Sequence, residues 1–526
     1  MSGAAAVYSK RGADLRVADV VREVAAARPD HLAIRCGERE LSYRELDERS
    51  NRLAQALLAA GADAGSRIAY LDRTGPEVIE LLFAASKIGA VTVPLNWRLS
   101  RPELASVVAD AQPPVLIAGE TYAAVAEELA EGRRLVVVER EYENWLAEHD
   151  AVDPGGGGES EDVVLQMYTS GTTGTPKGVL TTNRNMAACA ETSPWWSFDS
   201  DSVSMTPLPM FHIGGIGWAF LGLWNGATTV LAREFEAAAA LDIIEGQHVT
   251  NVVLVPTMLQ LLIAVPGASE RDFSALRCIT YGASPITTPV LSAALRTFRA
   301  PLFGIYGLTE TTGGITQLEP ADHDLDGPRQ HLLQSAGRPF PWVELRIADP
   351  QTGAELGSRE VGEVWLRAPN VMAGYYNHPE ETAAAVTEDG WLRTGDGGYL
   401  DDEGYLFLTD RIKDMIVSGG ENVYPIEVEE VVAQHPDVAE VAVIGVPDPR
   451  WGETVMALVV RHTGAKCTEE ELVEFARARL AGYKLPRSVE FVEKLPRTPT
   501  GKVLKRELRE RYGAKALDLV LYSHPG

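Results

Sequence analysis

The chain has 526 residues, of which 45% are hydrophobic and 23% are charged, and its formal net charge is −26. These proportions are ordinary for a globular protein and exclude wholesale disorder, a collagen-like repeat and a small disulfide scaffold. An acidic surface of this kind repels nucleic acid and anionic lipid, so an anionic ligand needs a local site. The length predicts about three to four folding units, or one large domain with a smaller one.

The cysteines stand far apart in the chain, at Cys36, Cys189, Cys278 and Cys467. No histidine or cysteine spacing typical of a metal site occurs, and widely spaced cysteines fit a reducing compartment. The N-terminal segment lacks the apolar core of a signal peptide, and polar residues and a proline interrupt the most apolar stretch, 252–265. We therefore predict a cytoplasmic protein with no transmembrane segment and no nucleic-acid partner; a homodimer is compatible with the sequence.

In chain order, residues 14–30 predict an amphipathic helix and 31–42 a hairpin turning near Gly37. Ser42 and Glu45 form a capping box that begins the next helix. Strand, helix and strand then follow at 67–72, 77–88 and 91–95. Further apolar strands are predicted at 114–119, 135–138, 228–232, 251–255, 278–284 and 302–307. Strands alternating with helices predict an α/β fold with doubly wound parallel sheets.

The character of the chain changes twice further on. A glycine-rich acidic stretch, 154–162, is predicted to join two elements. After residue 340, short alternating strands with polar turns predict a β-rich subdomain. Beyond residue 413, alternating helices and strands predict a small mobile α+β domain. We predict an N-terminal domain over 1–410, a hinge at 411–413 and a C-terminal lid domain over 414–526.

The segment 477–515 departs from the acidic trend, because it carries twelve Lys and Arg but only four Glu. Such a run is most often the solvated face of a helix. It is also the place where a polyanion is able to dock.

The strongest chemical motif is Tyr168–Gly178, with the sequence YTSGTTGTPKG, directly after an apolar strand. Successive N–H groups in a glycine-rich loop form a nest for phosphate oxygens, while hydroxyls add donors and Lys177 adds a positive charge. The loop is not a Walker A motif, because Gly178 and not Ser or Thr follows Lys177. We interpret it as a phosphate loop; the alternative is a flexible linker.

This loop resembles that of the adenylate-forming superfamily, which includes acyl-CoA synthetases, adenylation domains of peptide synthetases and firefly-type luciferases. The resemblance extends from about residue 15 to about residue 512. Further blocks carry it: YGASP at 281–285, YGLTET at 306–311, WLRTGD at 391–396, DRIKD at 410–414 and PTGKV at 499–503.

The resemblance implies a set of ATP- and AMP-binding residues: Thr169, Ser170, Gly171, Thr172, Thr173, Gly174, Gly282, Ala283, Tyr306, Gly307, Thr309, Asp396 and Arg411. A tyrosine ring such as that of Tyr306 is able to stack on a purine. An Asp and an Arg together are able to hold a ribose diol, which is the role implied for Asp396 and Arg411.

Catalytic roles are implied for Lys177, Thr309, Glu310 and Lys502, with Glu310 as the Mg²⁺ ligand. A mobile lysine ammonium such as that of Lys502 is able to stabilise charge that develops between a carboxylate and an α-phosphate. Taken alone, Lys502 would be read as a solvated surface lysine.

The implied reaction has two steps and uses ATP, Mg²⁺ and coenzyme A. A carboxylate first becomes an acyl-AMP with loss of pyrophosphate, and a thiol then displaces AMP. The resemblance places the hinge at Lys413 and the CoA path at Gly419 and Gly420, within SGGENVYP. Two adjacent glycines are also typical of a tight turn.

The block PLPMFHIGG at 207–215 resembles the segment that opens the acyl pocket. The implied acyl-binding residues are His212, Gly214, Gly215 and Gly313; a lone histidine is otherwise more often a core residue. Amino-acid-activating relatives carry an Asp where His212 stands, so an amino acid is disfavoured. We predict a medium- or long-chain fatty acid substrate.

Several alternatives stay open on the sequence. In the first alternative, the substrate is a cinnamate-type acid. In the second, the enzyme stops at acyl-AMP and loads a carrier protein. A non-catalytic nucleotide-binding module is the last alternative, and the intact charged positions argue against it.

Overall fold

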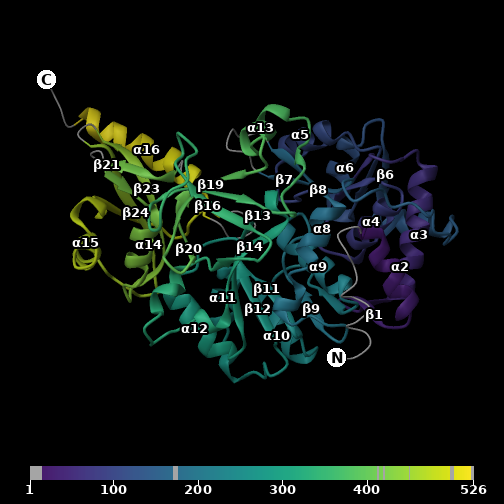
Figure 1. The fold of residues 1–526 in the computed structure, drawn as a ribbon, viewed down its shortest axis with the longest axis horizontal. Helices are drawn as coiled ribbons and strands as arrows, with labels where there is room; N and C mark the ends of the chain where they lie inside the picture. The colour runs from purple at the N-terminus through teal and green to yellow at the C-terminus, as the bar shows by residue number, and fades with distance from the viewer. Residues whose placement is uncertain are drawn as a thin grey trace.

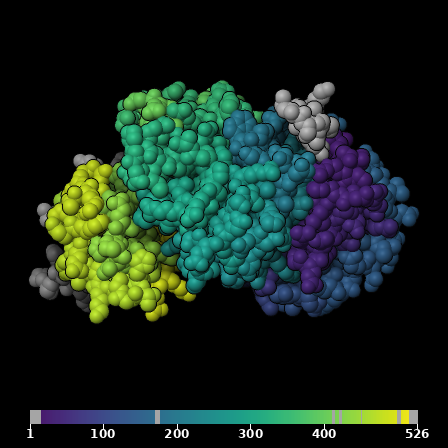
Figure 2. All heavy atoms as spheres, turned by 90° about the horizontal axis from the view of Figure 1, so that it is seen from below, coloured from purple at the N-terminus to yellow at the C-terminus, as the bar shows by residue number. Residues whose placement is uncertain are grey.

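The computed structural model describes residues 15–169, 176–411, 414–418, 421–448, 451–497 and 503–522. A large α/β body holds most of the chain, and the residues after 414 lie at one end of it (Figure 1). Seen from below, the molecule runs from this C-terminal end through a middle section to the N-terminal elements at the opposite end (Figure 2).

Two sheets form the large body. The nine-stranded sheet has the order β15-β14-β13-β12-β11-β9-β10-β1-β2, and the strands from β1 through β13 along this path are parallel. Its strands are β1 (Leu32–Cys36), β2 (Arg39–Ser42), β9 (Val203–Thr206), β10 (Thr228–Leu231), β11 (Asn251–Leu254), β12 (Cys278–Gly282), β13 (Leu302–Leu308), β14 (Gly313–Leu318) and β15 (Arg338–Pro339).

The seven-stranded sheet has the order β18-β8-β7-β4-β3-β5-β6, with β7, β4, β3, β5 and β6 parallel. Its strands are β3 (Arg67–Leu71), β4 (Val91–Pro94), β5 (Val115–Ala118), β6 (Arg134–Val137), β7 (Val163–Thr169), β8 (Lys177–Thr182) and β18 (Gly374–Tyr375). Two sheets of alternating strands and helices confirm the predicted α/β class.

Helices cover and separate these sheets (Figure 1). They are α2 (Val17–Ala27), α3 (Tyr43–Ala59), α4 (Pro76–Lys87), α5 (Arg101–Ala111), α6 (Ala123–Leu129), α7 (Glu143–Ala147), α8 (Asn183–Ala190), α9 (Ile213–Trp224), α10 (Ala237–Gly246), α11 (Pro256–Ile263), α12 (Thr288–Phe298) and α13 (Pro379–Ala385). Every residue of α4 is buried, and α4 contacts β4 and β7 of one sheet and β1 of the other. A helix between two sheets is buried on all sides, so its charged side chains need partners. Glu77, Glu80 and Lys87 pair with Arg39, Arg49 and Asp47, respectively.

Local predictions near the N-terminus are confirmed. The hairpin forms, and Ser42 caps α3 reciprocally with Glu45. The glycine-rich stretch 154–162 does join two elements, α7 and β7, and it is held in place. Arg22 of α2 pairs with Asp153 at 2.6 Å and donates to the carbonyl of Gly156 at 2.8 Å.

The predicted β-rich subdomain is a four-stranded antiparallel sheet. Its strands are β16 (Glu344–Ala348), β17 (Gly362–Arg367), β19 (Leu392–Leu400) and β20 (Leu406–Arg411). The apolar stretch 252–265 falls in β11 and α11. Within the described part of the chain, no helix is long and apolar enough to cross a membrane.

A smaller α+β unit follows. It contains β21 (Ile416–Ser418), β22 (Glu421–Val423), α14 (Pro425–Ala433), β23 (Val438–Asp448), β24 (Gly452–Arg461), α15 (Glu469–Arg477), β25 (Ser488–Phe491) and α16 (Lys505–Tyr522). Its sheet has its own apolar core around Ile416, Val443 and Val459. This unit touches the large body where Thr288 Oγ1, at the start of α12, donates to Glu430 of α14 at 2.7 Å.

Four of the twelve basic residues in the segment 477–515 pair with acids that are distant in sequence within this small unit. Lys484, Arg497 and Arg509 pair with Glu427, Glu440 and Asp414. Lys505 pairs with Glu429 at 2.9 Å. These pairs balance part of the local positive charge, and a polyanion site in this segment stays a prediction.

Candidate functional site

The phosphate loop begins and ends on two paired strands. Thr169 at the end of β7 lies opposite Lys177 at the start of β8, in an antiparallel pair. Residues 170–174, to which phosphate binding was assigned, lie outside the described residues. The stem therefore places both ends of the loop at the carboxyl edge of the seven-stranded sheet.

Lys177 and Glu310 come together through a third residue that the sequence did not single out. The Lys177 ammonium lies 5.2 Å from the centre of the Tyr375 ring, and the Tyr375 hydroxyl donates to Glu310 Oε1 at 2.9 Å. A cation over an aromatic face is attracted by the ring quadrupole. Tyr375 thus orients the predicted phosphate lysine and the predicted metal ligand on one face of the site.

The segment that carries Thr309 and Glu310 is a tight turn between β13 and β14, formed by η5 (Thr309–Thr311). Thr311 Oγ1 accepts from Leu308 N at 2.8 Å and donates to the carbonyl of Gly313 at 2.7 Å. A Cβ on Gly307 would clash with that same carbonyl. Only glycine fits at residue 307, and its main role is to allow β13 and β14 to approach closely.

The residues predicted to hold the adenosine are linked directly. The Tyr306 hydroxyl donates to Asp396 Oδ2 at 2.7 Å. Asp396 of β19 stands opposite Arg411 of β20 in the β-rich sheet. The register therefore brings the backbones of residues 396 and 411 next to each other.

The end of β12 has an unusual backbone. A Cβ on Gly282 would clash with the carbonyl of Ile305, and Ala283 has a φ of +67°. A non-glycine residue in the left-handed region is strained by roughly 1–3 kcal/mol and needs surrounding structure to hold it. This bend lies beside β13, the strand that carries Tyr306.

Glu310 fits a magnesium ion that arrives with a nucleotide. Among the described residues, no group of three or more His, Cys, Asp or Glu is arranged to hold a metal ion. Mg²⁺ is usually bound by one or two carboxylates together with substrate phosphates and waters. A single carboxylate beside a phosphate loop provides that donor set, and an all-protein metal cage is not needed.

His212 is the N-cap residue of α9 and is partly buried. Its Nε2 has no hydrogen-bond partner among the described residues, and its ring lies 4.5 Å from that of Phe211. Burial, with the nearby Arg98 cation, lowers the pKa of His212 to about 4. The imidazole is therefore neutral at physiological pH, and no carboxylate contributes to this shift.

The acyl-binding glycines divide into two groups. A Cβ on Gly215 would clash with the carbonyl of Pro209, so this glycine allows α9 to begin close to the preceding loop. A Cβ on Gly214 would touch the Leu208 side chain. Gly313 has a φ of +116°, and a Cβ on it would lie 3.2 Å from the Cys189 sulfur of α8. Gly313 and Gly214 are thus next to apolar groups.

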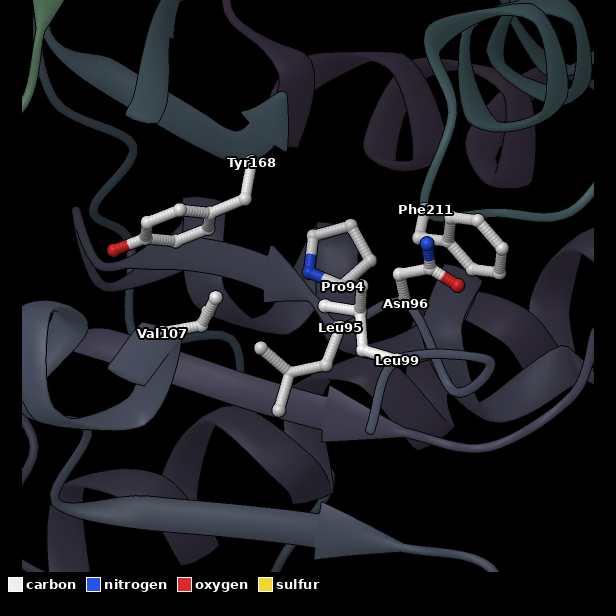
Figure 3. A pocket seen from close by; sticks show the side chains of 7 residues that line it. All are labelled: Pro94, Leu95, Asn96, Leu99, Val107, Tyr168 and Phe211. Atoms are coloured by element: carbon white, nitrogen blue, oxygen red, sulfur yellow. The ribbon is translucent and has the colours of Figure 1, made fainter. Parts of the chain in front are cut away.

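A small pocket opens beside the phosphate loop, at the carboxyl end of β4 (Figure 3). Tyr168 and Phe211 stand on either side of Pro94, and Tyr168 lies two residues before the undescribed loop segment. The Tyr168 hydroxyl donates to Asp110 at 2.6 Å, while burial raises the pKa of Tyr168. The lining is completed by Leu95, Asn96, Leu99 and Val107.

Four remaining predictions lie outside the described residues: Lys413, Gly419, Gly420 and Lys502. Their flanks are described. Ser418 pairs with Glu421 across the two glycines, and Arg497 bridges to Val503 across the loop with Lys502. The roles of these four residues stay predictions.

The architecture and these polar pairs define a carboxylate-activating, nucleotide-dependent ligase of the adenylate-forming type. Residues 21–376 match the AMP-binding enzyme family, and residues 427–502 match the AMP-binding enzyme C-terminal domain. The chain belongs to the AMP-binding enzyme family, within its acyl-CoA and acyl-carrier-protein ligases.

The chain is 40% identical to fatty acid–[acyl-carrier-protein] ligase ScoC of Streptomyces coeruleorubidus, over 92% of this chain and 94% of ScoC. It is 41% identical to feruloyl-CoA synthase of an Amycolatopsis species, over 92% of this chain and 96% of that enzyme. ATP-bound MatB of Rhodopseudomonas palustris superposes with a TM-score of 0.88 at 30% identity, covering 95% of this chain and all of MatB. These relatives confirm the predicted superfamily and an ATP-dependent acid–thiol ligase.

Proposed function

We propose that this chain converts an apolar monocarboxylic acid into its acyl-AMP and then into a thioester of coenzyme A. The observation that carries the proposal is the polar chain Lys177–Tyr375–Glu310 beside the linked pair Tyr306–Asp396. It gathers groups suited to phosphate, metal and adenosine at one edge of the large body.

In the first step, Tyr306 and Asp396 would hold the adenosine while Lys177 offsets charge on the departing pyrophosphate. Glu310 would hold Mg²⁺, which supplies further charge stabilisation on the phosphates. Lys502 would orient the attacking carboxylate. No protein nucleophile is needed, because the acid itself attacks the α-phosphate.

In the second step, a thiol would displace AMP. A turn of the C-terminal domain about Lys413 would carry Lys502 away and bring Gly419 and Gly420 to the thiol path.

The acid is proposed to be apolar and to lack an amino group. A primary ammonium needs a carboxylate partner, and His212 is neutral and buried next to Arg98 rather than next to an acid. A medium- or long-chain fatty acid meets this condition, in agreement with the name of the ScoC relative.

An aryl or cinnamate-type acid is the second candidate. Trp196 packs against Trp218 of α9, the helix that begins after His212, and against Phe340, which lies next to Gly314. One of the relatives is a feruloyl-CoA synthase.

Pyrophosphate release by the purified full chain tests the proposal, with Mg-ATP and hexanoate, laurate, palmitate, ferulate, acetate or phenylalanine. Release with at least one of the four apolar acids, and acyl-CoA formation only when CoA is added, supports it. Release confined to phenylalanine or to acetate contradicts the apolar acid. Thioester formation only with a pantetheinylated carrier protein contradicts CoA as the acceptor.

A further inference from the structure

An aromatic cluster connects the two segments to which acyl binding is assigned. We define it as Trp195, Trp196, Phe198, Trp218, Phe340 and Trp342. Its rings come from η3 (Ser193–Trp196) and the residues after it, from α9, and from the loop between β15 and β16. Segments far apart in sequence therefore build one continuous aromatic surface.

The rings are in direct contact from one end of the cluster to the other. Trp218 lies 5.2 Å from Phe198 and 5.4 Å from Trp196, between ring centres. Phe340 stacks on Trp342 at 5.1 Å with the rings nearly parallel, and Trp195 packs edge-on to Trp342 at 5.2 Å. Trp195 is 38% exposed, whereas Trp196 and Trp218 are buried, so the cluster extends from the interior to the surface.

Each acyl-binding segment touches this cluster. Trp218 is four residues after Gly214 on α9, and residues at that spacing lie on the same face of a helix. On β14, Gly314 follows Gly313, and a Cβ on Gly314 would lie 3.6 Å from the Phe340 ring. The aromatic cluster therefore adjoins both segments to which acyl binding is assigned.

The indole N–H groups of the cluster are not equivalent. Trp196 Nε1 donates to Gln317 Oε1 of β14 at 2.6 Å. The Nε1 atoms of Trp218 and Trp342 are buried and have no hydrogen-bond partner among the described residues. An indole nitrogen is a donor only, and a buried donor without an acceptor is unfavourable.

We propose that the aromatic cluster is the distal wall of the acyl pocket, and that Trp218 and Trp342 donate to an oxygen at the far end of the substrate. This inference rests on the proposed function and narrows its substrate class. The acid it selects is a flat aryl acid whose ring carries hydroxyl or methoxy oxygen. Such a ring packs against aromatic faces and edges, and its oxygen satisfies the indole donors.

A saturated fatty chain would leave both indole N–H groups without an acceptor. Sites built to hydrogen-bond a substrate group discriminate strongly against analogues that lack it. The discriminating comparison is therefore between two aryl acids that differ only in ring oxygen.

The experiment measures kcat/KM for acyl-AMP formation by the full chain with 4-hydroxy-3-methoxycinnamate and with unsubstituted cinnamate. The wild-type chain is expected to prefer the oxygenated acid by about tenfold or more, as one or two hydrogen bonds provide. Trp342→Phe and Trp218→Phe keep an aromatic ring but remove the N–H. Each is expected to reduce this preference by about fivefold, mainly through KM for the oxygenated acid.

Trp145→Phe is the matched control, because Trp145 is a buried tryptophan of α7 outside the cluster. It is expected to leave the preference unchanged. If Trp218→Phe does not fold, Trp342→Phe alone decides, since Trp342 is only partly buried.

Three results would overturn the inference: equal use of both aryl acids, a stronger preference for laurate, or an unchanged preference in the folded Trp→Phe variants. Activity on laurate alone would leave the proposed ligase function standing. No pyrophosphate release with any apolar acid would remove the proposed function itself.

Discussion

The nucleotide end and the acyl end of the site differ in how their polar atoms are satisfied. At the nucleotide end, Tyr306 is bonded to Asp396 and Tyr375 to Glu310. At the acyl end, the ring nitrogens of His212, Trp218 and Trp342 have no partner among the described residues. On the roles proposed above, the groups that meet ATP are oriented by other side chains of the protein, whereas several acyl-end groups are left to be satisfied by substrate or water.

The largest effect is expected from Glu310→Gln, which keeps the shape of the side chain but removes its charge. Pyrophosphate release should fall by roughly 100-fold or more, the range seen when a preorganised electrostatic group is lost. Stopped-time assays with saturating acid measure it. Glu344→Gln, at an exposed partner of Arg367, is the control and should match the wild-type chain. Nearly full activity in Glu310→Gln would show that the nucleotide end does not depend on this carboxylate.

Gly307→Ala tests whether the nucleotide end needs the close approach of β13 and β14. The added methyl group would clash with the carbonyl of Gly313, and overpacking of this kind costs about 1–3 kcal/mol. Urea unfolding should show that loss in the free energy of unfolding. Gly482→Ala, where a Cβ meets open space, should change it by less than about 0.5 kcal/mol. Equal stabilities would argue that the turn adjusts easily.

Asp396→Ala and Tyr306→Phe test the hydrogen bond between the two residues that are predicted to hold the adenosine. Asp396→Ala is expected to raise KM for ATP by about tenfold, as loss of a hydrogen bond to a charged group does, and Tyr306→Phe by less. KM for the acid should stay unchanged, because the acyl end is separate. The double variant should be less impaired than the two single effects combined predict, since both remove one contact. Full additivity would contradict a shared role.

His212→Phe tests whether the imidazole at the acyl end is buried, through the pH dependence of the free energy of unfolding. The pKa of His212 is about 4 in the folded chain, below its ordinary value of 6.5. Between these values the unfolded chain binds a proton that the folded chain does not, so stability falls as the pH decreases from 6.5 towards 4.

Removing the imidazole should reduce this slope by up to about 1.4 kcal/mol per pH unit. Unfolding by urea at pH 7, 6 and 5 measures the slope, and a variant of the exposed His331 serves as the control. An unchanged slope in His212→Phe would mean that this ring is accessible to solvent.

Sequence patterns predicted most of what is local in the chain. The phosphate loop, the capping box at Ser42 and the hairpin near Gly37 each depend on neighbouring residues, and the structure contains the stems of the first and all of the other two. The motifs WLRTGD and DRIKD predicted Asp396 and Arg411 as site residues, and the register between β19 and β20 pairs these two residues.

Residues brought in by distant segments could not be predicted in this way. Tyr375 belongs to β18, a two-residue strand whose position depends on pairing with β8. Trp196 and Phe340 meet only because α8, α9 and β14 pack together. Likewise, the pairing of Lys484, Arg497 and Arg509 could not be predicted, because their acidic partners lie elsewhere in the sequence.

The contact between Thr288 and Glu430 links the two units mechanically. Thr288 begins α12, five residues after the strained Ala283 at the nucleotide end, and burial raises the pKa of Glu430. A reorientation of the small unit that separates α12 from α14 must break this bond and hydrate a carboxylate that is partly buried here. The bond thus couples the start of α12, close to the bend at Ala283, to the placement of the small unit.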